Sequence, residues 1–329
     1  MAPDRTRLVE ALRADRSLSL GELAHITQLD ESTIVTLLHQ LEHDGLPMQK
    51  EGNSHFKLLD NMTPIDVGDL VSRLKSANFP FADRVVVLDT VDSTSDWLSR
   101  EQQDGMDIHG KTCITEFQSA GRGRRGKSWR GSPYCHLMLS MGWRFEKEAT
   151  EMAGLSLSIG VAIAERLKDL TGAPVGLKWP NDLLCKERKL GGILVDLNAP
   201  LEGGTFAVIG IGINLREPRL DQLDTGQPVT DLASNAQGDL ASRATIIASV
   251  LGSIAHALER FEQHHFLPDQ ACFNALDVFS DRKVRAESEG RRLEGVGAGA
   301  DEQGRYRLRC ADGTVATVIS GDISLSLVN

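Results

Sequence analysis

The chain has 329 residues and a formal net charge of −10, and 41% of its residues are hydrophobic. This composition predicts a globular protein of two or three domains and excludes a disordered chain or one coated in basic residues. We expect no membrane span, because no apolar run approaches about 20 residues, and no secretory signal in the first 12 residues. The five cysteines form no CxxC pair, which favours a reducing cytoplasm over a disulfide or zinc framework.

Residues 1–62 predict a winged helix-turn-helix domain. Ser19 and Glu22 have the spacing of a capping box at a helix start, Asp30 caps the next helix and Gly45 ends it. Residues 46–49 and 55–59 flank a polar turn and predict a hairpin. The apolar residues at helical spacing are Leu8, Leu12, Leu20, Leu23, Ile26, Ile34, Leu37, Leu38 and Leu41.

Residues 63–277 predict a mixed α/β domain, because strand-like and helix-like stretches alternate there. The expected helices are residues 154–170 and 243–264. The expected strands are residues 85–88, 112–117, 136–142, 175–178, 192–197 and 206–213.

Residues 278–329 predict a small β-barrel. Short alternating runs are separated by glycines and acidic turns, which is the pattern of a compact all-β unit. The five expected strands are residues 283–286, 291–296, 306–309, 314–319 and 323–328.

A cationic, glycine-rich loop is the densest motif. Residues 121–128 match the GxxxxGKS pattern of a phosphate-binding loop, but residues 129–133 cannot begin the helix that such a loop requires, so we reject an NTPase. Arg122, Arg124, Arg125 and Lys127 repel one another unless an anion lies among them, and arginine suits phosphate and carboxylate oxygens. The alternative is a solvated basic loop.

Further polar motifs follow predicted strands. In residues 178–184, Pro180 ends a strand, and the following turn places Lys178 and Asp182 at the strand's end. Residues 188–192 and 209–214 contain glycines that admit a close neighbour or a ligand. Residues 92–96 supply hydroxyls and, taken alone, predict a helix N-cap. Residues 178–184, taken alone, predict only a polar turn.

In this order and spacing, these motifs resemble the bacterial biotin–protein ligases, and GRGRRG and KWPNDL are their specific strings. The resemblance covers the whole chain in its bifunctional ligase/repressor form. It implies an α+β protein with an N-terminal winged helix-turn-helix, a central biotin/lipoate ligase-like domain and a C-terminal SH3-like barrel. It also implies that the chain makes biotinyl-AMP from biotin and ATP with Mg²⁺ and transfers biotin to a lysine of the biotin carboxyl carrier protein of acetyl-CoA carboxylase.

The resemblance assigns the site residues. Hydroxyl and amide groups suit the ureido ring of biotin, Trp129 would stack on adenine, and Asp182 would orient the acceptor amine. No side chain is assigned to a metal. The residues expected to bind biotin are Ser93, Thr94, Ser95, Gln118, Arg122, Gly123, Arg124, Lys189, Gly191 and Gly212. Those expected to bind ATP or the adenylate are Arg122, Arg124, Arg125, Trp129, Lys178, Asn181, Lys189 and Asn214. The expected catalytic residues are Lys178, Lys189, Asp182 and Arg124.

The resemblance further implies operator binding and a homodimer with biotinyl-AMP bound. The expected recognition helix, residues 30–44, contains no Lys or Arg, and residues 1–60 hold six cations against ten acids. Phosphate contacts usually dominate DNA affinity, so the alternative is a winged helix kept for stability or protein contacts. The candidate DNA contacts are Ser32, Thr33, Thr36, His39, Gln40 and Lys50, with Lys57 on the wing.

Two other functions stay open at this point. A transcription factor with a ligand-sensing domain would bind ligand without turnover. A lipoyl or octanoyl transferase would use a related fold, although a polar ureido pocket does not suit an acyl chain.

Overall fold

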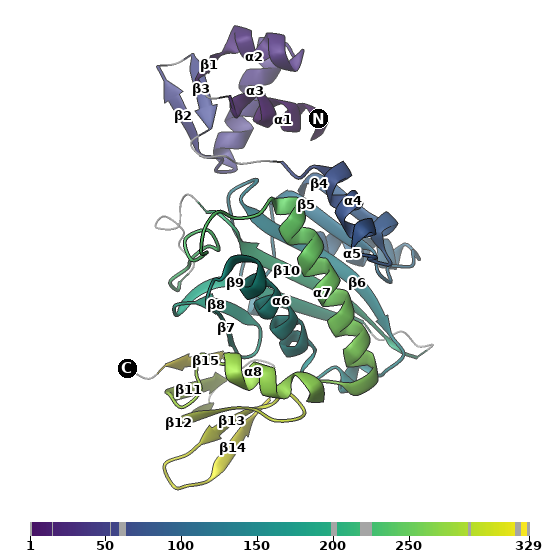
Figure 1. Ribbon diagram of the computed structural model, residues 1–329, viewed down its shortest axis with the longest axis vertical. Helices are drawn as coiled ribbons and strands as arrows, with labels where there is room; N and C mark the ends of the chain where they lie inside the picture. The colour runs from purple at the N-terminus through teal and green to yellow at the C-terminus, as the bar shows by residue number, and fades with distance from the viewer. Residues whose placement is uncertain are drawn as a thin grey trace.

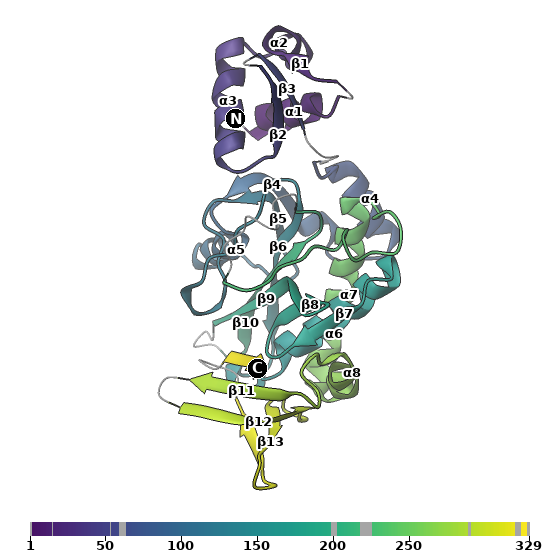
Figure 2. The ribbon, with the colours of Figure 1, turned by 90° about the vertical axis from the view of Figure 1, so that its left-hand side faces the viewer.

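The computed structural model describes residues 2–14, 16–52, 54–58, 64–198, 203–217, 226–288, 291–319 and 324–327. Figure 1 shows three parts along the long axis: the N-terminal helices and hairpin, a large central sheet with its helices, and a smaller C-terminal sheet. Figure 2 shows the same order after a quarter turn. Within the described residues, no helix is long and apolar enough to cross a membrane.

The N-terminal unit forms as the caps predict. Ser19 and Glu22 make the capping box of α2, and the carboxylate of Asp30 accepts from the amide of Thr33 at the start of α3. Ile26 is a correction to the predicted apolar face: it is 54% exposed, because α2 buries Leu23 and Thr27 instead. The elements are α1 (Ala2–Leu12), β1 (Leu18–Ser19), α2 (Leu20–Thr27), α3 (Glu31–His43), β2 (Met48–Glu51) and β3 (His55–Leu58). Asn53 and Leu59 of the predicted hairpin lie outside the described residues.

The central sheet has the order β4-β5-β6-β10-β9-β8-β7, with β4 and β5 parallel and the other neighbours antiparallel. All six predicted strands are present, most of them longer than expected. The short β8, which follows the turn after β7, is not among the predicted strands. The strands are β4 (Val85–Val91), β5 (Thr112–Gln118), β6 (His136–Phe145), β7 (Val175–Lys178), β8 (Asp182–Cys185), β9 (Arg188–Asn198) and β10 (Thr205–Asn214).

Helices cover both faces of this sheet. The long α6 and α7 cover one face, and α5 lies on the other (Figure 2). Both predicted helices are present, with α7 at its expected bounds and Gly154 as the N-cap of α6. The helices are α4 (Val67–Ser76), α5 (Thr94–Gln103), α6 (Leu155–Thr171), α7 (Arg243–His264) and α8 (Gln270–Leu276).

The C-terminal sheet is antiparallel, in the order β14-β13-β12-β11-β15, and it shares the main hydrophobic core with the central sheet. The indole Nε1 of Trp179, in the turn after β7, donates to the carbonyl of Gly304 at 3.0 Å. The strands are β11 (Lys283–Ser288), β12 (Arg291–Ala300), β13 (Tyr306–Arg309), β14 (Val315–Val318) and β15 (Ser324–Leu327). Ile323 and Val328 of the last predicted strand lie outside the described residues.

The N-terminal unit is docked on the central one by a second core. Tyr134 and Cys135, which precede β6, pack among the buried residues of α1, α2 and α3. The hydroxyl of Tyr134 donates to Asp89 of β4 at 2.7 Å, and Arg5 of α1 pairs with the same carboxylate at 3.3 Å. The segment that carries Tyr134 leads directly from the cationic loop, so this loop is connected to the docking contact through the chain.

Candidate functional site

A cavity of about 540 Å³ lies between the N-terminus of α5, the cationic loop, the turn after β7, and strands β9 and β10. This volume suits a small ligand rather than a few waters. The cavity brings together nearly every predicted site residue. Those that line it are Ser93, Thr94, Ser95, Gln118, Arg122, Gly123, Arg124, Arg125, Trp129, Lys178, Asn181, Asp182, Lys189, Gly212 and Asn214.

Gly191 is the exception, and the structure corrects that prediction. It does not line the cavity, whereas its neighbour Gly192 does. A Cβ atom on Gly191 would lie 2.5 Å from the carbonyl oxygen of Gly212 on the adjacent strand. Since successive residues of a strand face opposite sides, an error of one position exchanges the two faces of the sheet.

One end of the cavity is built from hydroxyl and amide groups. The backbone N–H of Thr94 donates to Gln118 Oε1 at 2.8 Å, and the Thr94 hydroxyl lies 2.7 Å from the hydroxyl of Ser140 on β6. Ser95 also contacts Ser140, at 2.9 Å. Ser93 is the N-cap of α5, so the N-cap prediction is confirmed alongside the pocket position. The sequence reasoning missed Ser140, whose strand gives no sign of this cross-sheet contact.

Glycines on β10 make room for the side chains that face the cavity. A Cβ atom on Gly210 would lie 2.7 Å from Ser95 Oγ, and one on Gly212 would lie 2.7 Å from the indole ring of Trp129. Trp129 therefore packs directly over Gly212, and the predicted close approach at this strand is confirmed. Its Nε1 is buried without a hydrogen-bond partner among the described residues.

We call residues 121–129 the flap. The amide of Gly123 donates to the Lys127 carbonyl at 2.7 Å, and the amide of Trp129 donates to the Gly121 carbonyl at 2.8 Å. Between them, Arg124–Gly126 forms a single 3₁₀ turn and not the start of a helix. The loop is therefore not followed by the helix that the phosphate-binding loop of an NTPase requires, as the sequence predicted.

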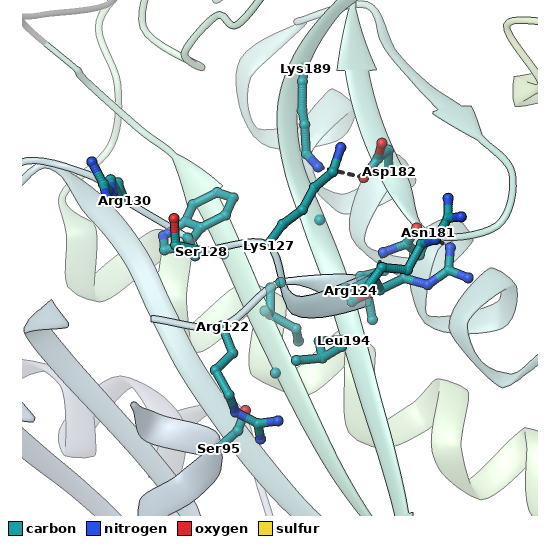
Figure 3. A pocket seen from close by; sticks show the side chains of 18 of the residues that line it. Ser95, Arg122, Arg124, Lys127, Ser128, Arg130, Asn181, Asp182, Lys189 and Leu194 are labelled. Atoms are coloured by element: carbon teal, nitrogen blue, oxygen red, sulfur yellow. Dashed lines mark hydrogen bonds and ion pairs between the residues drawn. The ribbon is translucent and has the colours of Figure 1, made fainter. Parts of the chain in front are cut away.

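The cations separate into two groups. Figure 3 shows Lys127 and Lys189 extending towards Asp182 and Arg124 lying beside Asn181, while Arg122 extends the other way, towards Ser95. Lys189 Nζ lies 2.7 Å from Asp182 Oδ1, and Arg124 donates to Asn181 Oδ1 at 3.1 Å.

Lys178 lies at the same end of the cavity and is partly buried. Its burial lowers its pKa, and the neighbouring Lys189 and Lys127 lower it further, while Asp182 opposes them. A bound anion would relieve this repulsion, because it would stabilise the charged ammonium. This end of the cavity is therefore suited to a phosphate or a carboxylate.

Behind the flap, a buried acid fixes the segment that leads to Tyr134. The amide and hydroxyl of Ser132 donate to Glu217 at 2.9 and 2.8 Å, and His136 Nε2 lies 2.9 Å from the same carboxylate. Burial acts to raise the pKa of Glu217, but His136 and Ser132 together lower it to about 2. Glu217 is therefore held as a buried anion between these two residues.

The pocket region matches a known family. The model of the "Biotin/lipoate A/B protein ligase family" matches residues 87–214, and that of the "Biotin protein ligase C terminal domain" matches residues 279–326. The chain is 33% identical over 316 residues to the Bifunctional ligase/repressor BirA of Salmonella typhimurium, which covers 96% of this chain and 95% of that protein. The chain belongs to the biotin protein ligase family.

Other members of the biotin protein ligase family agree with this result. The Escherichia coli BirA is 37% identical, with 73% of this chain and 74% of that protein covered. The biotin–[acetyl-CoA-carboxylase] ligase of Mycobacterium tuberculosis is 30% identical over 79% of this chain and 95% of that protein. The Aquifex aeolicus biotin protein ligase, solved in complex with biotin and ATP, superposes with a TM-score of 0.64 at 25% identity, covering 74% of this chain and 99% of that one.

Proposed function

We propose that this chain is an ATP-dependent biotin–protein ligase, with biotin at the hydroxyl end of the cavity and the adenylate at the cationic end. The observation that carries the proposal is the separation of these two ends within one cavity. Thr94, Ser95 and Gln118 offer both donors and acceptors, which suits the two N–H groups and one carbonyl of a urea. Lys178, Lys189 and Arg124 offer positive charge for the carboxylate and the phosphates.

The first step joins two anions. A biotin carboxylate oxygen bonds to the α-phosphorus of ATP, and the bond from that phosphorus to the bridging oxygen of pyrophosphate breaks. Lys178, Lys189 and Arg124 lower the barrier by neutralising charge that is concentrated in the transition state. The flap then covers the mixed anhydride, which water would otherwise hydrolyse.

The second step transfers the acyl group. A neutral lysine amine of the biotin carboxyl carrier protein bonds to the acyl carbon, and AMP leaves with the electrons of the broken C–O bond. Asp182, the first residue of β8, lines this part of the cavity and would orient the amine or accept its proton. Its Oδ1 lies 2.7 Å from the Lys189 ammonium, within reach of the same region.

Mg²⁺ fits this site as a companion of ATP. The described residues contain no cluster of three His, Cys, Asp or Glu side chains that could hold a metal, so a cage made by the protein is not expected there. Magnesium commonly takes one or two carboxylates together with substrate phosphates and water. Asp182 would supply the carboxylate, and the ion would add charge neutralisation at the phosphates.

The flanking units complete the proposal. We assign residues 1–62 to a winged helix-turn-helix domain, residues 63–277 to the ligase domain and residues 278–329 to an SH3-like barrel. The order of three helices and a hairpin in the first unit, and five antiparallel strands in the last, support these assignments. A cytoplasmic location and a homodimer with biotinyl-AMP bound stay predictions.

One experiment separates the ligase from its alternatives. The purified chain is incubated with ATP, a carrier domain and either biotin, lipoate or octanoate, and the carrier is weighed by mass spectrometry. We expect a biotinyl adduct alone. A lipoyl or octanoyl adduct would contradict the substrate assignment, and biotin binding without any adduct would indicate a ligand sensor without turnover.

A second function, repression of a biotin operon, is supported by the match to the Salmonella ligase/repressor over 96% of the chain. On α3, Ser32, Thr36, His39 and Gln40 are exposed, as base contacts require, and Thr33 is half-buried. The Lys50 ammonium, however, lies 2.7 Å from Glu42, which leaves little positive charge for phosphates. A gel shift with operator DNA, biotin and ATP at increasing salt tests it, and no shift at low salt would leave only the ligase.

A further inference from the structure

The flap is fastened at two points, and one of them has no place in the chemistry described above. At the first point, Arg124 contacts Asn181 beside the phosphate region. At the second point, two residues earlier in the chain, the guanidinium of Arg122 lies between two carboxylates, with Nε 2.8 Å from Asp96 and Nη2 2.6 Å from Asp196. Figure 3 shows Arg122 directed towards Ser95 and away from Lys189 and Asp182.

The two carboxylates come from two different elements, helix α5 and strand β9. Asp96 lies in the first turn of α5, next to the hydroxyl residues Thr94 and Ser95. Asp196 lies near the end of β9, the strand that carries Lys189 at its start. Through Arg122, the flap is therefore tied to both α5 and β9.

The charges in this cluster exclude a second anion. Two carboxylates around one guanidinium leave a net negative charge, which would repel a phosphate or a biotin carboxylate. Arg122 therefore cannot bind the phosphates while both pairs are made, and that task falls to Lys178, Lys189 and Arg124. The three side chains are each between 38% and 39% exposed, so the pairs are open to salt and can break.

We propose that Asp96 and Asp196 are positioning residues that clasp the flap shut through Arg122, and that this clasp sets how long biotinyl-AMP stays on the enzyme. The proposal rests on the proposed ligase function. It assigns to Arg122 the holding of the flap instead of contact with the adenylate. Because the two carboxylates pair with the flap's arginine and are not among the residues that line the cavity, their removal is expected to change retention of the adenylate more than its formation.

The test uses Asp96→Asn, Asp196→Asn and the double variant in the full chain. Biotinyl-AMP is formed on the enzyme from labelled biotin and ATP, excess unlabelled biotinyl-AMP is added, and the loss of label is followed by rapid filtration. We expect loss to be about 3-fold faster in each single variant and about 10-fold faster in the double variant. The burst of pyrophosphate release is expected to stay within about 2-fold.

A salt series and a mutant cycle distinguish a clasp through Arg122 from a general loss of order in the flap. In the wild type, loss of the adenylate is expected to quicken as salt rises from about 0.05 to about 1 M, and the double variant should lack most of this dependence. Adding Asp96→Asn and Asp196→Asn to Arg122→Ala should have no further effect, because the carboxylates act through that arginine. Asp69→Asn, which removes a similarly exposed pair with Arg73 on α4, is the matched control and should match the wild type.

The outcomes are separable. If the wild type makes adenylate and the double variant loses it at the wild-type rate, the clasp is refuted while the ligase stands. Additive effects of the aspartate variants and Arg122→Ala would likewise refute the clasp alone. If the wild type never makes adenylate, the ligase function fails, and the clasp fails with it.

Discussion

Arg5 of α1 and Asp89 of β4 form an ion pair across the junction between the N-terminal and central units, with Arg5 Nε 3.3 Å from Asp89 Oδ2. Both side chains are less than a tenth exposed, at 8% and 6%. The same carboxylate accepts from the Tyr134 hydroxyl. A buried charge of this kind is costly without its partner, so the pair defines where the N-terminal unit docks.

Replacing Asp89 with alanine tests that docking. The change leaves Arg5 with Asp44 as its remaining carboxylate and removes the acceptor of the Tyr134 hydroxyl. We expect the free energy of unfolding of the N-terminal unit to fall by about 2–3 kcal/mol, measured by hydrogen exchange of the α1 amides. Asp4→Ala, which breaks an exposed pair with Arg7, should cost below about 1 kcal/mol, and equal effects of the two changes would contradict a buried docking pair.

Replacing Lys189 with alanine tests the cationic end of the cavity. It removes a charge assigned to the first chemical step and leaves the hydroxyl end intact. We expect adenylate formation, followed by pyrophosphate release, to fall by about 10²–10³-fold, while biotin still binds measurably in calorimetry. Lys168→Ala, which removes an exposed lysine from the last turn of α6, serves as the control. Pyrophosphate release at the wild-type rate would refute the role of Lys189.

Adding a methyl group at Gly212 tests the position of Trp129. The new Cβ atom would lie 2.7 Å from the indole, so the ring must move out of the cavity wall. We expect the KM for ATP to rise about 10-fold, with a smaller change for biotin, if Trp129 packs against adenine. Gly252→Ala in α7 is the matched control, because among the described residues no atom outside its own stretch of helix lies within 4 Å of its added Cβ, and it should slightly raise thermal stability. An unchanged KM for ATP in Gly212→Ala would contradict a contact between Trp129 and adenine.

The Glu217 carboxylate predicts an acid-sensitive contribution to stability. Its pKa of about 2 in the folded chain lies below the ordinary value, so the folded state favours the ionised form. This stabilisation amounts in total to about 3 kcal/mol, is complete above about pH 5 and is lost as the pH falls towards 2. Urea denaturation of the wild type and of Glu217→Gln should therefore give a difference that shrinks between about pH 6 and about pH 3, and a constant difference would contradict the buried anion.

The sequence patterns predicted most of the strands, the two long helices and half of the residues that line the cavity, for local reasons. Ser19, Asp30 and Pro180 act on the backbone within a few residues, so their effects can be deduced from neighbours alone. The site motifs could be placed because GRGRRG and KWPNDL are themselves short and local.

The site residues that were wrongly predicted or not predicted from the sequence have physical explanations. Gly191 and Gly192 differ by one residue and face opposite sides of β9, and the spacing of the motif does not tell which side is the cavity. Ser140 and Leu325 reach the site from distant strands, so nothing near them in the chain marks them. The partners of Arg122 could not be predicted for the same reason, because Asp96 and Asp196 approach it only once α5 and β9 have packed in the fold.

The hydrogen bond from Trp179 to the Gly304 carbonyl joins the last part of the chain to the turn that holds Asn181 and Asp182. Leu325 of the final strand also reaches the cavity wall. The C-terminal sheet thus supports one wall of the candidate site, and the chain must be synthesised through β15 before that wall is complete. A ribosome-bound intermediate lacking the sheet would carry every signature motif and still be an unfinished enzyme.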